Sequence, residues 1–240
     1  SPGESRVRVL TAFCNSGKES VVTGVGDLFE QGGVSDFFNP AGCKNAMGSK
    51  GCTAAPSPWF GYQAEEVAYA SRSYKAGDPK TPEPSNALLS VSGVVGILSG
   101  GEGRTGLLTW IDAQATRRPG SFGILSGSQR SFLRDLFVGR DLGDTLSQMQ
   151  AIDGASRARL EVTVTRLDDA APAASVRVAV RDSGGIQKTV LVTDAGGKAK
   201  VDLPPGNYSL VAGELGHAIE APTAVTVPSI SAFPCLVAAK

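Results

Sequence analysis

The stretch Thr193–Leu210, TDAGGKAKVDLPPGNYSL, contains the clearest structural signals in the chain. It starts with an acidic-Gly turn, continues as a short run of alternating polar and apolar residues, and passes through Pro-Pro-Gly into an aromatic run. Alternation at period two is typical of a strand with one buried face, and Asp, Gly and Pro favour turns. The stretch therefore predicts two strands, Lys198–Leu203 and Asn207–Gly213, joined by a proline corner.

The neighbouring sequence repeats this pattern of short alternating runs separated by turn signals. Such runs, without a helical pattern between them, predict a small antiparallel β-sandwich over residues 154–240. The further predicted strands are Arg159–Arg166, Ser175–Asp182, Ile186–Thr193 and a possible edge strand, Ala224–Pro228. The residues expected in the core are Val162, Val164, Val176, Val178, Val180, Val190, Leu191, Val201, Leu203, Tyr208, Leu210 and Ala212.

The series PAASVRVAVRDSGG…TVLVTDAGGKAKVDLPPGNYSLVA resembles the carboxypeptidase regulatory-like domain, a prealbumin-like β-sandwich. The resemblance covers about one third of the chain and implies a fold but no single function, because this domain is an accessory in many secreted and surface proteins. Some pilin and adhesin relatives form a Lys–Asn/Asp isopeptide bond, which we do not expect here because Arg159–Arg166 contains no lysine. The matching residues are Thr193, Asp194, Gly197, Leu203, Pro204, Pro205, Gly206 and Tyr208.

The turn in this stretch has a structural and a functional interpretation. In the structural one, Asp194 caps the turn, Gly196 and Gly197 adopt conformations closed to other residues, and the prolines end one strand and direct the next. The alternative is a weak calcium site that uses Asp168, Asp169 or Asp194, although no EF-hand spacing is present. We expect the structural role.

Residues 1–153 predict a larger β-rich domain with loop insertions and a short helix. Tyr62–Lys75 fits either a helix or an exposed strand pair, and Ser128–Ile152 is expected to be helical in part, with Ser128 as N-cap. The expected strands are Arg6–Phe13, Ala87–Leu98, Thr105–Ala113 and Ser121–Gly127, and the apolar face of the expected helix is Phe132, Leu133, Leu136 and Phe137.

The segment GVGDLFEQGGVSDFFNP and the strands after it loosely resemble the region that precedes the metal-binding domain of secreted polymerase-and-histidinol-phosphatase (PHP) metallohydrolases. The His-x-His metal signature of those enzymes is absent from the chain. This resemblance implies an accessory part or a processed fragment of such an enzyme.

Composition limits the classes of partner and compartment. The 23 basic and 23 acidic residues balance, so no long-range field favours nucleic acid, and no apolar run approaches the roughly 20 residues that span a bilayer. The loop between Cys43 and Cys52 is polar and Gly-rich, which favours a disulfide between them and leaves Cys14 to pair with Cys235. Four cysteines allow three pairings, and four buried thiols in a cytosolic protein are the alternative. We expect an extracytoplasmic protein without metal or cofactor.

Few residues suggest chemistry. His217 is the single histidine, so a triad or a zinc site has little support. Pro-flanked Trp59, Phe60 and Tyr62 could form a sugar- or peptide-binding surface or could plug one end of a sandwich. The acidic cluster Asp27, Glu30 and Asp36 could supply the two carboxyl groups of a hydrolase or serve as turn acids.

Together these patterns predict a mainly β protein without catalytic activity, with a structural or binding role at the cell surface or in the extracellular space. An adhesin, an appendage subunit or an envelope-assembly subunit would fit, with other protein chains as partners, because exposed edge strands pair readily with neighbouring chains. The alternative is a set of accessory domains or a processed fragment of a secreted metallohydrolase.

Overall fold

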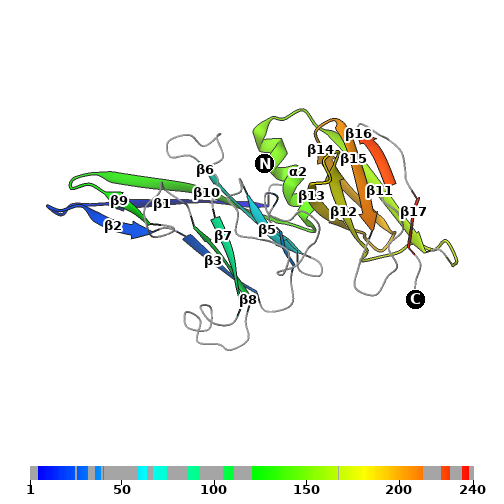
Figure 1. Cartoon of the computed structure of the whole chain (residues 1–240), viewed down its shortest axis with the longest axis horizontal. Coiled ribbons are helices and arrows are strands. Elements are labelled where there is room, and N and C mark those ends of the chain that lie inside the picture. Colours follow the sequence, from blue (N-terminus) through cyan, green and yellow to red (C-terminus); the bar gives the residue numbers. More distant parts are fainter. Residues whose placement is uncertain are drawn as a thin grey trace. The chain divides into compact units, whose positions relative to one another are not determined.

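The structure is a computed structural model that describes residues 5–24, 26–31, 36–38, 40, 59–63, 67–74, 86–91, 105–110, 121–166, 168–212, 223–227 and 234–237. Strands predominate in these residues, which confirms the predicted mainly β fold class (Figure 1). The chain divides into an N-terminal unit, built mainly from residues 5–137, and a C-terminal unit, built mainly from residues 138–240. The predicted domain boundary at residues 153 and 154 stays a prediction. No helix in the described part is long and apolar enough to cross a membrane.

The strands of the N-terminal unit form three groups. The largest sheet has the order β1-β10-β6-β5-β4, the second the order β3-β8-β7, and β2 pairs with β9 alone. The bounds are β1 Arg6–Cys14, β2 Val21–Gly24, β3 Gly26–Gln31, β4 Asp36–Phe38, β5 Phe60–Gln63, β6 Ala68–Tyr74, β7 Asn86–Val91, β8 Thr105–Trp110, β9 Ser121–Ile124 and β10 Gln129–Gly139.

Two predictions for this part needed the structure to decide them. The ambiguous segment Tyr62–Lys75 is β-structure, since it contains the end of β5 and all of β6. The helix expected to start at Ser128 is wrong: the four apolar residues of its face lie in β10, which pairs with β1 over nine residues. Pairing with β1 and β6 satisfies the β10 backbone, so tertiary context overrides the local helical spacing. The expectation that Ser128–Ile152 is helical in part is nevertheless confirmed, because α2 spans Leu142–Asp153, with Asp141 as its N-cap.

The C-terminal unit contains two sheets that enclose one apolar core. One sheet has the order β14-β11-β17 and the other the order β13-β12-β15-β16. Every strand predicted here is present within two residues of its expected bounds. These bounds are β11 Ala158–Arg166, β12 Arg177–Asp182, β13 Gln187–Val192, β14 Lys198–Leu203, β15 Gly206–Ala212 and β16 Thr223–Val227, and β17 Pro234–Val237 is an additional strand.

The core of this unit is apolar. Ten of the predicted core residues belong to its central cluster, Tyr208 packs against that cluster, and Val190 is buried outside it. Leu160 on β11 is fully buried at the centre, whereas Ile186, in the turn before β13, is 40% exposed. Burial of a Leu or Val side chain contributes about 1.5–3 kcal/mol each, so these positions account for much of the stability of the unit.

We predict that Leu160→Ala lowers the free energy of unfolding by about 2–5 kcal/mol, because it leaves a cavity in a closed core. Ile186→Ala, at the partly exposed position, should cost less than about 1 kcal/mol. Urea denaturation followed by fluorescence or circular dichroism would compare the two variants. Equal losses would contradict this assignment of the core.

Candidate functional site

The turn between β13 and β14 is held by the side chain of Asp194. Its Oδ1 accepts hydrogen bonds from the backbone N–H groups of Gly196 and Lys198, both at 2.9 Å. The pKa of Asp194 is lowered, chiefly by the hydrogen bond from the Lys198 N–H. The Gly196 N–H and the charge of Arg140 also lower it, whereas burial acts in the opposite direction. Gly197 has φ +70°, and a Cβ there would lie 2.3 Å from the Val164 carbonyl oxygen. The capping role of Asp194 is confirmed, but only Gly197 of the two glycines is left-handed.

The rest of this stretch also has a structural role. The hydroxyl of the buried Thr193 accepts the Val176 N–H at 2.9 Å and donates to the Ala173 carbonyl oxygen at 2.7 Å. The Tyr208 hydroxyl donates to the Pro204 carbonyl oxygen at 2.8 Å, across the proline corner. The stretch is therefore a corner that joins the sheets.

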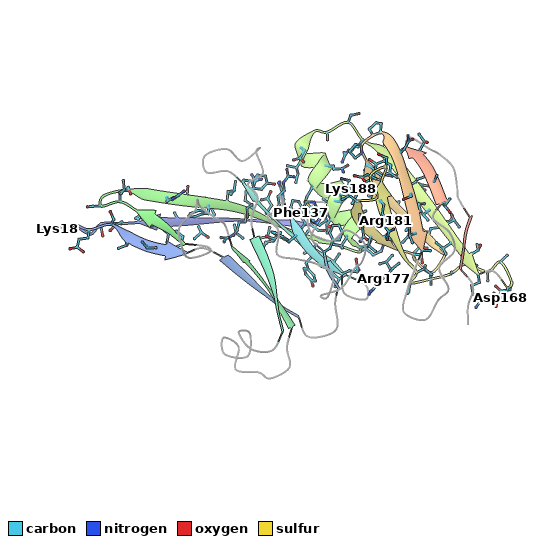
Figure 2. The ribbon with its side chains drawn as sticks, viewed as in Figure 1. Lys18, Phe137, Asp168, Arg177, Arg181 and Lys188 are labelled. Atoms are coloured by element: carbon cyan, nitrogen blue, oxygen red, sulfur yellow. The ribbon has the colours of Figure 1, made fainter. Side chains whose placement is uncertain are left out.

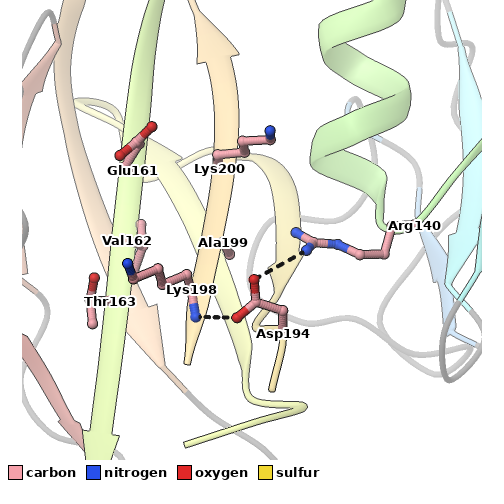
Figure 3. Close-up of a pocket in the computed structure, with 8 residues that line it drawn as sticks. All are labelled: Arg140, Glu161, Val162, Thr163, Asp194, Lys198, Ala199 and Lys200. Atoms are coloured by element: carbon pink, nitrogen blue, oxygen red, sulfur yellow. Dashed lines mark hydrogen bonds and ion pairs between the residues drawn. The ribbon is translucent and has the colours of Figure 1, made fainter. Parts of the chain in front are cut away.

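One face of this corner forms a wall of a shallow groove of about 350 Å³ (Figure 3). Figure 3 shows Asp194 between the Arg140 side chain and the Lys198 backbone. The Arg140 guanidinium lies 3.9 Å from Asp194 Oδ2. Across the two strands, Glu161 lies opposite Lys200 and Thr163 opposite Lys198. The lining residues are Arg140, Glu161, Val162, Thr163, Asp194, Lys198, Ala199 and Lys200.

The lining of this groove offers charged and polar groups that can recognise a polar ligand. Its eight lining residues include no histidine, cysteine or serine, and its one hydroxyl side chain is that of Thr163. Both signs of charge are present and partly compensate each other, so the groove favours no strongly charged ligand. The described residues also contain no group of three His, Cys, Asp or Glu side chains that could hold a metal ion.

The acids considered for calcium lie in two separate turns. Asp169 pairs with the Arg166 guanidinium and accepts the Ala171 N–H at 3.0 Å. Figure 2 shows Asp168 projecting from the same turn, between β11 and β12, where its side chain is 66% exposed. Asp194 caps the β13–β14 turn, and its Oδ1 already accepts two hydrogen bonds.

The N-terminal unit contains a buried carboxylate that the sequence did not reveal. Asp135 on β10 is fully buried and receives a bidentate pair of hydrogen bonds from Arg8, at 2.7 and 2.8 Å. Arg6 adds a contact at 3.0 Å and the Tyr74 hydroxyl donates at 2.8 Å. We call these four residues the Asp135 cluster. Arg8 lies directly opposite Asp135 in the β1–β10 register, so the pair is a cross-strand ion pair.

Electrostatics in the Asp135 cluster favour the charged carboxylate. Burial opposes its ionisation, but hydrogen bonds from Arg8 and Tyr74 and the positive charges of both arginines lower the pKa of Asp135 below its usual range. Burial and the hydrogen bond to Asp135 raise the pKa of Tyr74 to about 12. The carboxylate has its acceptors occupied from three sides, so it stabilises the sheet and is not free to act as a base.

The sequence-predicted site residues are dispersed. Trp59 and Phe60 are buried, and the Trp59 ring packs 5.1 Å from that of Phe38, while Tyr62 lies in β5. Asp27 and Glu30 lie in β3 and Asp36 lies in β4, in different sheets. The binding and acidic-cluster hypotheses stay predictions.

The cysteines are only partly described. Cys14 is an exposed free thiol at the end of β1, and Cys235 lies in β17. Cys43, Cys52 and His217 lie outside the described residues. Both predicted disulfides stay predictions.

The sequence contained signals for the residues it failed to identify. Asp141 stands three residues before Asp144, a spacing typical of a helix N-cap, and accepts the Asp144 N–H at 2.8 Å. Asp135 is the one acid in Phe132–Val138, a run that is apolar apart from Arg134 and Asp135, which indicates a buried carboxylate that needs a cation. The cation, Arg8, is 127 residues away, so only the strand register identifies it.

Comparison with known proteins gives no family. No protein-family model matches the chain, and no curated protein matches it significantly. The PHP metallohydrolase resemblance therefore receives no support.

Among solved structures, the minor pilin of Streptococcus agalactiae aligns with 73% of this chain and 82% of its own, at 15% identity and a TM-score of 0.29. The pilus 2b backbone protein of group B streptococcus aligns with 98% of this chain and 91% of its own, at 10% identity and 0.27. A polysaccharide lyase aligns with 98% of this chain and 32% of its own, at 10% identity and 0.27. Scores this low establish neither a common overall fold nor a common function.

We predict that Asp135→Asn lowers the free energy of unfolding by about 3 kcal/mol at pH 7, because it removes the charge that Arg6 and Arg8 neutralise. The folded pKa of Asp135 is lowered, so its contribution is present above the unfolded pKa of about 3.9 and is lost as the pH falls through the folded pKa. Denaturant titrations of wild type and variant from pH 7 to 2 should therefore converge below about pH 4.

Asp168→Asn is the matched control, since this carboxylate is exposed and should change stability by less than about 0.5 kcal/mol. A gap between wild type and Asp135→Asn that widens in acid would contradict the assigned role of the Asp135 cluster.

Proposed function

We propose that this chain is a non-catalytic structural or binding protein that joins other protein chains through open sheet edges. Its place would be the cell surface or the extracellular space, as an adhesin, appendage or envelope-assembly subunit. A C-terminal sandwich of the carboxypeptidase regulatory-like type is part of this proposal. The main support for this proposal is a difference between the two sides of that sandwich. Helix α2 covers the edge strands β13 and β14, whereas on the opposite side one sheet ends in β16.

The closed side depends on two side chains of the helix and its cap. Strands β13 and β14 are the end strands of their two sheets. Asp141 Oδ2 accepts the Val192 N–H of β13 at 3.0 Å, and Ser147 Oγ accepts the Asp202 N–H of β14 at 2.9 Å. A Cβ at Gly143 would lie 2.2 Å from Leu191 Cδ2, so glycine permits this close approach. The helix therefore gives edge N–H groups internal partners.

The open side has no comparable protection among the described residues. Strand β16, Thr223–Val227, pairs with β15 on one side only, and its sequence TAVTV contains no charge and no proline. Val225 and Val227 are buried in the core, while Ala224 and Thr226 are exposed. Such an edge can accept a further strand.

The buried acids support a role without catalysis. Asp135 and Asp141 are fully buried, and each accepts hydrogen bonds from groups that hold the fold together. Burial raises the pKa of Asp141. The hydrogen bonds from the Val192 and Asp144 N–H groups and the charge of Arg140 lower it, but burial has the larger effect. Perturbed pKa values often mark active sites, but here both are explained by structural contacts.

Native mass spectrometry of the unreduced protein tests the proposal over a range of concentrations. The wild type should form oligomers, and Ala224→Lys should shift them toward smaller species, because a charge on an edge strand opposes strand addition. Ala174→Lys places the same charge on an exposed turn and should leave the oligomers unchanged. A wild type that stays monomeric at every concentration, or equal effects of the two variants, would sink the proposal.

A second prediction concerns the closed side. Asp141→Ala should lower the free energy of unfolding by about 2–4 kcal/mol, since it removes an N-cap and leaves the buried Val192 N–H without its acceptor. Asp141→Asn keeps a good capping oxygen and should lose less. Thermal and urea denaturation would measure both.

The pH dependence of Asp141 has the opposite sign to that of Asp135. Because the folded pKa of Asp141 is raised, its contribution is full below the unfolded pKa and is lost as the pH rises through the folded pKa. This dependence should be absent in Asp141→Asn. If the difference in unfolding free energy between wild type and Asp141→Asn did not change with pH, the raised pKa of Asp141 would be contradicted.

A further inference from the structure

We propose that strand β1 binds a second copy of this chain, with the two β1 strands antiparallel and Leu10 of one copy opposite Leu10 of the other. This inference rests on the proposed function and names the partner and the geometry of one contact.

Strand β1 is the end strand of the five-stranded sheet and pairs with β10 on one side. It is nine residues long, and in the described part of the chain no second strand pairs with it. Val7 is 59% exposed and Leu10 is 66% exposed. The strand contains no lysine and no proline, the residues that commonly protect an edge. A long edge with exposed apolar side chains favours strand addition over solvation.

The charges of β1 allow a copy of itself to bind. Arg6 and Arg8 would normally repel a second β1, but the Asp135 carboxylate binds both guanidinium groups. In a parallel, in-register pair, Arg8 would lie beside its own copy at about 4.8 Å between strands. In the antiparallel pair, four residues separate the two Arg8 positions along the strand, about 13 Å at about 3.3 Å per residue. That distance exceeds the Debye length of about 8 Å at physiological ionic strength, so repulsion selects the antiparallel arrangement.

The register follows from the length of the strand and its exposed side chains. Leu10 is the middle residue of β1, so pairing centred on it uses all nine residues of both copies. Val7 then lies opposite Phe13 of the second copy, and this contact occurs twice. Pairs of an aromatic and a β-branched residue directly opposite each other stabilise antiparallel sheets. Phe13 is already fixed by an edge-on contact with Phe132 at 6.0 Å between ring centroids.

Site-specific crosslinking in the full chain tests the register. In a Cys14→Ser, Cys235→Ser background, Leu10→Cys should form an interchain disulfide under mild oxidation, because directly opposite Cβ atoms lie about 4.5–5.5 Å apart. Ala12→Cys is the matched control: it is exposed on the same face of β1, but the two copies of residue 12 would lie about 13 Å apart. The expected result is a shift from monomer to dimer on a non-reducing gel for Leu10→Cys only.

Other outcomes overturn the inference in distinguishable ways. Crosslinking of both variants to the same extent would indicate parallel, in-register stacking. Crosslinking of neither would exclude a β1 pair and leave the edge to a different protein. If neither variant crosslinks while Ala224→Lys still shifts oligomers toward monomer, the inference fails and the proposed function stands. If the wild type is monomeric at every concentration, both fail.

Discussion

On the outer side of an edge strand, the backbone N–H and C=O groups have no neighbouring strand to bond. How this chain satisfies or exposes those groups is the main constraint on its structure. A mostly β chain with two β units has many such edges. On the β13 and β14 side, the chain places a helix whose cap and first turns supply acceptors to the edge N–H groups. The close approach at Gly143 and the buried carboxylate of Asp141 are consequences of that solution. Strands β1 and β16 are also end strands, and no comparable protection of them is present among the described residues.

The buried charge of Asp135 lies next to one of these edge strands, β1. A fully buried Asp135 is costly to desolvate, and it is retained with two arginines and a tyrosine around it. Its position opposite Arg8 fixes the register of β1 on β10, since a one-residue slip would separate the ion pair and reverse the faces of the strand. It also neutralises part of the charge of an edge strand. The stability of this sheet depends on this carboxylate, and the proposed pairing of β1 would depend on it as well.

The sequence predicted the C-terminal unit well because its strands alternate strictly and its turns contain Asp, Gly and Pro. It failed for β10, where Phe132, Leu133, Leu136 and Phe137 have helical spacing. That spacing arises because Arg134 and Asp135 occupy buried positions of a strand that would otherwise be apolar. Two buried charged residues thus hide a strand from pattern analysis, and Arg8, the partner of Asp135, lies too far away in sequence to be found. Gly197 was predictable from its turn, whereas the different conformation of Gly196 required the structure.

The two edges proposed for pairing, β1 and β16, would limit assembly differently. An antiparallel β1 pair is isologous: it uses the same surface of both copies and is complete with two chains. On its own it gives a dimer and no larger assembly. Strand β16 belongs to the other unit, so each chain of such a dimer keeps a second open edge. Pairing at β16 would then link dimers into a longer series, and the closed β13 and β14 edges would prevent branching there. If β1 and β16 are the edges used, the proposed contacts would give a linear assembly.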